Sequence, residues 1–162
     1  MKKNNKIVYF LYLLGIATQV VATYPALADA EIEFSRSSLR IETADAVHIF
    51  DVEVATNDEQ RSRGLMFRNE LAPSAGMIFL YKRDRLLTMW MANTYLPLDM
   101  LFIGGDGNIV HIVENAIPLS RAMISSRRRA RAVLEVNAGT VSRLEIKVGD
   151  RVFHDGLTAP YP

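Results

Sequence analysis

The stretch that decides the fold is Asp99–Val113, "DMLFIGGDGNIVHIV", in which two apolar segments flank a glycine-rich tetrapeptide. The "GGDG" of residues 104–107 favours a tight turn, and the β-branched and aromatic residues on each side favour strands. This stretch therefore predicts a β-hairpin. Outward from it, in both directions, the chain continues with short apolar runs separated by turn residues.

Strand signals dominate from residue 36 onward. Phe50, Val52 and Val54 alternate with Asp51 and Glu53, which is the period-2 pattern of a half-buried strand. Further strands are predicted at 76–81, 86–91 and 131–139, and a tight turn at Gly149 and Asp150 precedes a last one. We therefore predict a mainly β domain, an antiparallel sandwich or small barrel with one or two short helices.

One helix is well signalled in "ATNDEQRSRGLMFR". Thr56 is the expected N-cap, with Glu59 three residues later as the second member of a capping box. Gly64 stands where a helix-ending glycine is common. A second, shorter helical turn is predicted over residues 140–145.

The N-terminus has the pattern of a signal peptide. "MKKNNK" carries three lysines, the apolar run 7–22 follows, and Ala26 and Ala28 occupy small-residue positions before a cleavage point after residue 28. A retained anchor is the alternative, but Gly15 and Gln19 break the run, and a spanning helix needs about 20 apolar residues. We expect residues 1–28 to be removed, 29–35 to be a flexible leader and 36–162 to form one domain, exported to the periplasm or outside the cell.

Charge and cysteine content narrow the class of protein. Residues 1–28 hold three lysines and no acid, so the other 134 residues carry 16 basic and 18 acidic side chains, a net charge of −2. That balance does not favour a nucleic-acid-binding protein. The chain has no cysteine, which excludes disulfides, thiol catalysis and thiolate metal sites.

Four motifs, in order, resemble those of domain-of-unknown-function family 192. They are "RSRGLMFR", "GMIFLY", "MWMANTYLPLDMLFIGGDGNIV" and "AVLEVNAGTVSRLEIKVGDRV", within about residues 47–152. The resemblance implies a small, mainly β domain, often exported in bacteria, with no settled activity. The residues that match are Arg63, Gly64, Leu65, Met66, Arg68, Gly76, Met77, Phe79, Trp90, Met91, Asn93, Thr94, Pro97, Leu98, Asp99, Leu134, Glu135, Gly139, Gly149 and Asp150.

The "MWMANTYLPLDMLF" motif, residues 89–102, has two interpretations. Trp90 and Met91 could be core, with Asn93 and Asp99 capping backbone donors around a turn. Alternatively, an exposed Trp90 stacks on a flat polar ligand such as a sugar, Met66 adds apolar contact, and Asn93 and Asp99 orient the ligand. The exposure of Trp90 distinguishes the two interpretations.

Glu135 lies among apolar neighbours on a predicted strand, so we expect it to pair with Arg63 or Arg68. The pair either stabilises the fold or lines a pocket, where the planar fork of an arginine binds an anion. Arg127, Arg128 and Arg129 belong to a charge run expected in a solvated loop, where they could bind an anionic envelope polymer.

Sequence thus predicts an exported envelope module that binds a small polar or carbohydrate-like ligand. The predicted site residues are Arg63, Met66, Arg68, Trp90, Met91, Asn93, Asp99 and Glu135. Three alternatives remain: a carbohydrate hydrolase using Asp99 and Glu135 as acid and base, a Cu(I)-binding protein using methionines, and a structural module without a pocket. The absence of catalytic motifs argues against an enzyme, and we expect no cofactor, no metal, no nucleic acid and no membrane insertion after cleavage.

Overall fold

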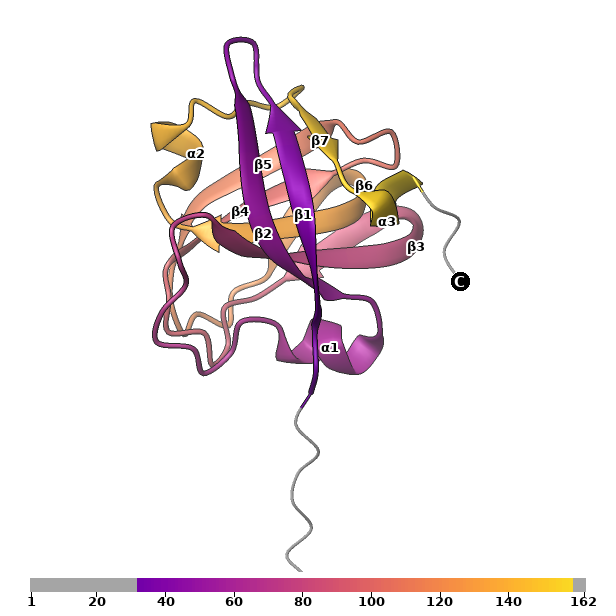
Figure 1. Cartoon of the computed structure of the whole chain (residues 1–162). Helices are drawn as coiled ribbons and strands as arrows, with labels where there is room; N and C mark the ends of the chain where they lie inside the picture. Colours follow the sequence, from indigo (N-terminus) through magenta and orange to yellow (C-terminus); the bar gives the residue numbers. More distant parts are fainter. Residues whose placement is uncertain (1–31, 159–162) are drawn as a thin grey trace, which may run out of the picture. The chain divides into compact units, whose positions relative to one another are not determined.

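The computed structural model describes residues 32–158, which form seven strands and three short helices (Figure 1). The strands are β1 Ser35–Glu42, β2 Val47–Ala55, β3 Ala75–Met89, β4 Leu98–Ile103, β5 Ile109–Ala116, β6 Ile124–Asn137 and β7 Arg151–Phe153, and the helices are α1 Asp58–Arg63, α2 Thr140–Arg143 and α3 Asp155–Thr158. The predicted signal peptide lies outside the described residues. In the described part of the chain, no helix is long and apolar enough to cross a membrane.

All seven strands form a single curved sheet in the order β5-β4-β6-β3-β2-β1-β7 (Figure 1). The mainly β class and the 104–107 hairpin between β4 and β5 are confirmed. The expectation of a purely antiparallel sheet is wrong, because β2 and β3 pair in parallel. The connection between these two strands contains α1. It carries the chain back to the end of the sheet at which β2 began, so β3 runs in the same direction as β2.

Two strands are longer than the sequence indicated. The run expected at 76–81 and most of that expected at 86–91 belong to the single 15-residue strand β3, which ends at Met89 and whose pairing with β6 shifts register between Leu80 and Arg85. Such irregularities bend a strand without ending it. The run Arg127–Arg129 lies in β6 and not in a loop, although all three side chains are exposed. Arg127 has a φ of 55° and lies where the pairing of β3 with β6 shifts register a second time, between Leu86 and Thr88.

Both faces of the sheet are covered, so the central strands are buried on both sides. One apolar cluster contains Ile78, Leu134 and Val136, and the other contains Met77 and Met100. In β4 all six residues are buried. The second cluster packs on the face toward α1, and this face carries the candidate site.

Candidate functional site

A hollow of about 270 Å³ opens beside the end of α1. Arginines and apolar side chains from α1 and the turn after it form one wall, and residues of β3 form another. Trp90 lies directly after β3 at the edge of the hollow, and Glu135 of β6 reaches it from within the sheet. Four of the eight predicted site residues therefore come together here: Arg63, Met66, Trp90 and Glu135.

Local sequence explains how α1 positions its side chains. The helix is capped one residue later than expected: Asn57 is the N-cap, and its side chain and that of Gln60 complete the capping box. The helix ends at Gly64, whose φ is +46°, a conformation that favours glycine. A Cβ at this position would lie 3.2 Å from the Phe79 ring, so the missing side chain lets the end of the helix approach β3.

Glu135 is the most unusual residue of the site. Its side chain is only 4% exposed, and no residue in 32–158 forms a hydrogen bond or ion pair with its carboxyl group. Burial raises the pKa of this carboxyl from 4.5 to about 8, because a low-dielectric site disfavours the charged form. At neutral pH Glu135 is therefore mostly protonated, and it can donate as well as accept a hydrogen bond.

The register of the sheet explains why the expected arginine does not reach Glu135. Glu53, Met77, Glu135 and Met100 are successive partners across β2, β3, β6 and β4. The fully buried Met77 stands between the two glutamates, which places them about 10 Å apart at the usual strand spacing. Arg68 pairs with the nearer one, Glu53, at 2.9 and 2.5 Å, so the prediction that an arginine pairs with Glu135 is wrong.

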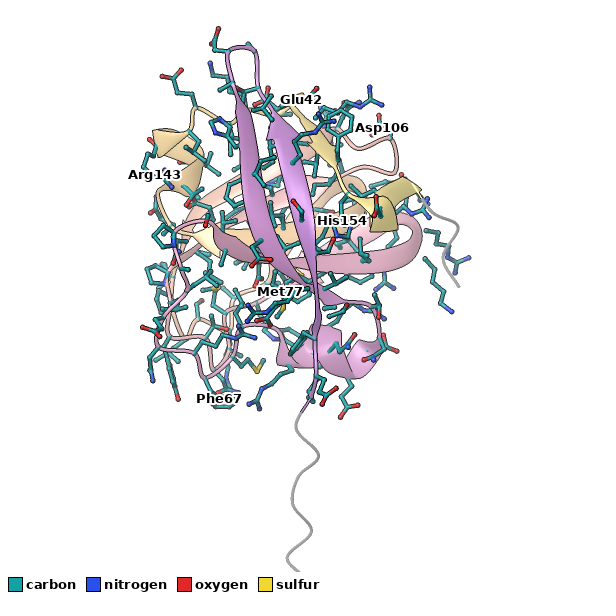
Figure 2. All side chains as sticks on the ribbon, viewed as in Figure 1. Glu42, Phe67, Met77, Asp106, Arg143 and His154 are labelled. Carbon is teal, nitrogen blue, oxygen red and sulfur yellow. The ribbon has the colours of Figure 1, made fainter. Side chains whose placement is uncertain are left out.

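Arg68 consequently lies outside the hollow. It lines a separate surface depression with Glu53 and Arg36, and the Arg68 hydrogen bond is the main cause that lowers the pKa of Glu53. Arg63 stays in the hollow, with its guanidinium carbon 4.8 Å from the centre of the Phe67 ring. Figure 2 shows Phe67 in the loop that follows α1, at the bottom of the view, whereas Glu42, the last residue of β1, lies near the top.

The tryptophan motif divides between the hollow and the core. Trp90 is 52% exposed, whereas Met91 is buried in the core below it. Asn93 has a φ of 57° and forms a turn, and its carbonyl accepts a hydrogen bond of 2.9 Å from the Phe67 amide. Asn93 therefore joins two loops beside the hollow, and its amide nitrogen lies 3.8 Å from the Met66 sulfur.

Asp99 lies on the other face of the sheet. It is fully buried and pairs across strands with Val136, which belongs to the opposite apolar cluster. Its two carboxylate oxygens accept hydrogen bonds of 2.9 Å from the amides of Asn115 and Val141. The carboxylate thus satisfies backbone donors of β5 and of α2, a structural role that the capping interpretation anticipated.

Three side chains that the sequence analysis did not single out complete the site: Arg61, Tyr81 and Arg85. Both guanidinium carbons lie within 5.0 Å of the Tyr81 ring centre. Burial raises the Tyr81 pKa, and the two positive charges partly oppose that rise. The alternation that places Met77 and Phe79 on one face of β3 extends to Tyr81, so the sequence could have predicted that Tyr81 lies on this face. Arg85 follows a register shift in β3, and no sequence pattern predicted which face it would occupy.

Metal ligands are sparse around the hollow. Met66 and Met89 line it, but no histidine does. Among residues 32–158 no three histidine, aspartate or glutamate side chains are grouped as a metal site would require.

Comparison with known proteins places the chain in a family. The model of the family DUF192, described as "Uncharacterized ACR", matches residues 39–154. A search of curated proteins found no match.

Two crystal structures resemble the chain in both fold and sequence. A Sinorhizobium meliloti protein described as a "putative transcription regulator" is 48% identical, with a TM-score of 0.76 over 78% of this chain and 98% of that one. A Novosphingobium aromaticivorans protein of unknown function is 35% identical, with a TM-score of 0.74 over 86% of this chain and 99% of that one. By the extent of the family match, this chain belongs to DUF192.

Proposed function

We propose that this protein is an exported binding or accessory module of the cell envelope whose hollow binds a small polar, carbohydrate-like ligand. The observation that carries the proposal is the Glu135 carboxyl, buried at the hollow with no polar partner in the described part of the chain. Glu135 lines the hollow, so its carboxyl group is open to a ligand there. A ligand hydroxyl that hydrogen bonds to this carboxyl supplies the polar partner that residues 32–158 do not.

Trp90 supplies the second element of sugar recognition. Half of its surface is exposed at the edge of the hollow, so its ring can stack on the apolar face of a sugar. Met66 adds apolar contact from the end of α1. A hollow of about 270 Å³ is below the ~300–1,000 Å³ typical of sites for drug-sized molecules, which favours a ligand of one sugar ring.

Export rests on residues 1–28, which lie outside the described residues. The net charge of −2 for residues 29–162 and the six-residue length of the longest described helix, α1, favour ligand binding over DNA recognition. The label given to the Sinorhizobium meliloti protein is therefore not extended to this chain. The exposed side chains of Arg127–Arg129 on β6 are a separate proposal, as a contact for an anionic envelope polymer.

The alternatives receive less support from the arrangement of side chains. A hydrolase using Asp99 and Glu135 needs both acids in one cleft, but the two project from opposite faces of the sheet. Copper binding would have to rely on Met66 and Met89 without a histidine in the hollow. A purely structural module gives no reason for the unpartnered Glu135.

Titration with neutral monosaccharides tests the proposal. The emission of Trp90, the only tryptophan, should change saturably on binding, together with amide resonances of α1 and β3. Glu135→Leu should abolish binding, because it removes the buried donor and acceptor. Asp99→Asn is the matched control, since it alters a buried acid on the other face and should leave the affinity unchanged. Equal affinity for the Glu135→Leu variant would refute the proposed site.

A further inference from the structure

The hollow holds more positive than negative charge. Among its lining residues are three arginines, Arg61, Arg63 and Arg85, and two acids, Asp58 and Glu135. Asp58 neutralises Arg61 through a 2.5 Å ion pair. Glu135 is mostly uncharged at neutral pH, because burial raises its pKa to about 8. Two positive charges in the lining are thus left without a neutralising acid.

Arg63 and Arg85 are those two. No ion pair joins either of them to a carboxylate within residues 32–158. Each guanidinium carbon lies 4.8 Å from the centre of an aromatic ring, Phe67 for Arg63 and Tyr81 for Arg85. A cation over the face of an aromatic ring is attracted by the ring, and a guanidinium carries five N–H donors. The rings thus help to hold both arginines in place, and neither guanidinium donates to a carboxylate among residues 32–158.

The backbone around Arg63 is also constrained. The helix that carries it ends at Gly64 with a φ of +46°, and Phe67, three residues later, has a φ of +64°. A bulky residue rarely adopts this conformation, which costs on the order of 1–3 kcal/mol and tends to occur at functional sites. Here the conformation places the Phe67 ring against the Arg63 guanidinium and within 6.1 Å of the Tyr95 ring centre.

We infer that the ligand is a hydroxylated molecule that carries an acidic group, with Arg63 and Arg85 binding the anion while Glu135 hydrogen bonds to a hydroxyl. This inference rests on the proposed function and narrows it to sugar acids or sugar phosphates. Carboxylate and phosphate share the geometry that a guanidinium fork matches. A cationic ligand is disfavoured, since it would lie beside two unneutralised arginines.

Calorimetric titration of the protein, purified as the cell produces it, separates the two proposals. Glucose, glucuronate and glucose 6-phosphate form a matched series that differs only at one end of the molecule. At least one of the two anionic compounds should bind tenfold or more tightly than glucose, and the preferred anion identifies carboxylate or phosphate as the natural group. Added salt should reduce this advantage.

Arginine variants test the assignment of the anion to its site. Arg63→Gln and Arg85→Gln should each weaken binding of the anionic compound by at least five times the factor by which they weaken binding of glucose. Arg128→Gln, an exposed arginine outside the hollow, is the control and should change neither affinity. Equal affinities for glucose and both anions would overturn this inference and leave the proposed function intact. Failure of all three compounds to bind at millimolar concentration would overturn both.

Discussion

The buried Glu135 carboxyl should control how stability depends on pH, and Glu135→Gln is the perturbation that isolates it. Glutamine has nearly the same shape and stays polar and uncharged at every pH. The wild-type carboxyl has a pKa of about 8 in the folded protein and 4.5 as its ordinary value. Between these two values the unfolded state has lost a proton that the folded state retains.

The sign and size of the effect follow from this difference. The unfolded state binds fewer protons in this interval, so the free energy of unfolding falls as the pH rises. Each pH unit contributes about 1.4 kcal/mol, and the loss accumulates to about 5 kcal/mol between pH 4.5 and pH 8. The stabilisation is complete below pH 4.5 and is lost once the folded carboxyl also ionises above pH 8.

Two histidines titrate in the same interval with the opposite sign. Burial lowers the pKa of His111 and of His154 below 6.5, so the unfolded chain binds protons that the folded chain does not, and stability rises with pH through that range. Both histidines are present in wild type and variant. Their contribution therefore cancels when the two unfolding free energies are subtracted, leaving the Glu135 contribution.

Urea denaturation at pH 5 to 9, followed by Trp90 fluorescence, measures the difference. Glu135→Gln should match wild type near pH 5 and become more stable by several kcal/mol at pH 8. Glu114→Gln, at an exposed glutamate of β5, should follow wild type across the whole range. If the free energies of unfolding of wild type and Glu135→Gln change with pH in parallel, the Glu135 carboxyl has the same pKa in the folded and unfolded states. That result would contradict the burial of an uncharged carboxyl at the hollow.

Three further substitutions distinguish fold from site. Asp99→Asn should lower the unfolding free energy by about 1–3 kcal/mol, because one of the two backbone amides that donate to Asp99 loses its acceptor, while sugar affinity in the Trp90 titration stays unchanged. Trp90→Phe should cost under about 1 kcal/mol in thermal denaturation followed by circular dichroism, since half of the side chain is exposed, but should weaken sugar binding measured by calorimetry. Gly76→Ala should cost about 1–3 kcal/mol or more in urea denaturation, because its Cβ would lie 2.7 Å from the Glu135 carbonyl oxygen; unchanged stability would contradict the close approach of β3 and β6.

Sequence reasoning predicted the strands best where one face of the strand meets water. In β2, Phe50, Val52 and Val54 are buried and Asp51 is exposed, as their alternation indicated. Trp90 also alternates in the sequence with Met89 and Met91, and both methionines are buried while Trp90 is exposed. In each case the apolar residues of the pattern face the core and the residues that alternate with them face solvent.

The amino-acid pattern did not predict orientation where a strand is buried on both faces. All six residues of β4 are buried, so its sequence carries no alternation to show which side Asp99 faces. The sequence also did not predict the parallel pairing of β2 and β3 or the bulge within β3. Both depend on which strands become neighbours, and the pattern within one strand does not contain that information. The partner of Arg68 depended on the same information.

The row of partners that runs from Glu53 through Met77 and Glu135 to Met100 accounts for the division of roles among the acids. Residues that are partners across neighbouring strands project from the same face of the sheet, so these four side chains share one face. Because side chains alternate along a strand, Asp99, the neighbour of Met100 in β4, projects from the other face. Arg68 reaches Glu53 on β2, whereas Glu135 lies two strands away on β6, on the far side of the fully buried Met77. A shift of one residue in the β4–β6 register would move Asp99 to the face of the hollow. The pairing of strands, more than any single motif, therefore leaves the carboxyl of Glu135 buried and without a polar partner among residues 32–158, in the same hollow as Trp90 and three arginines.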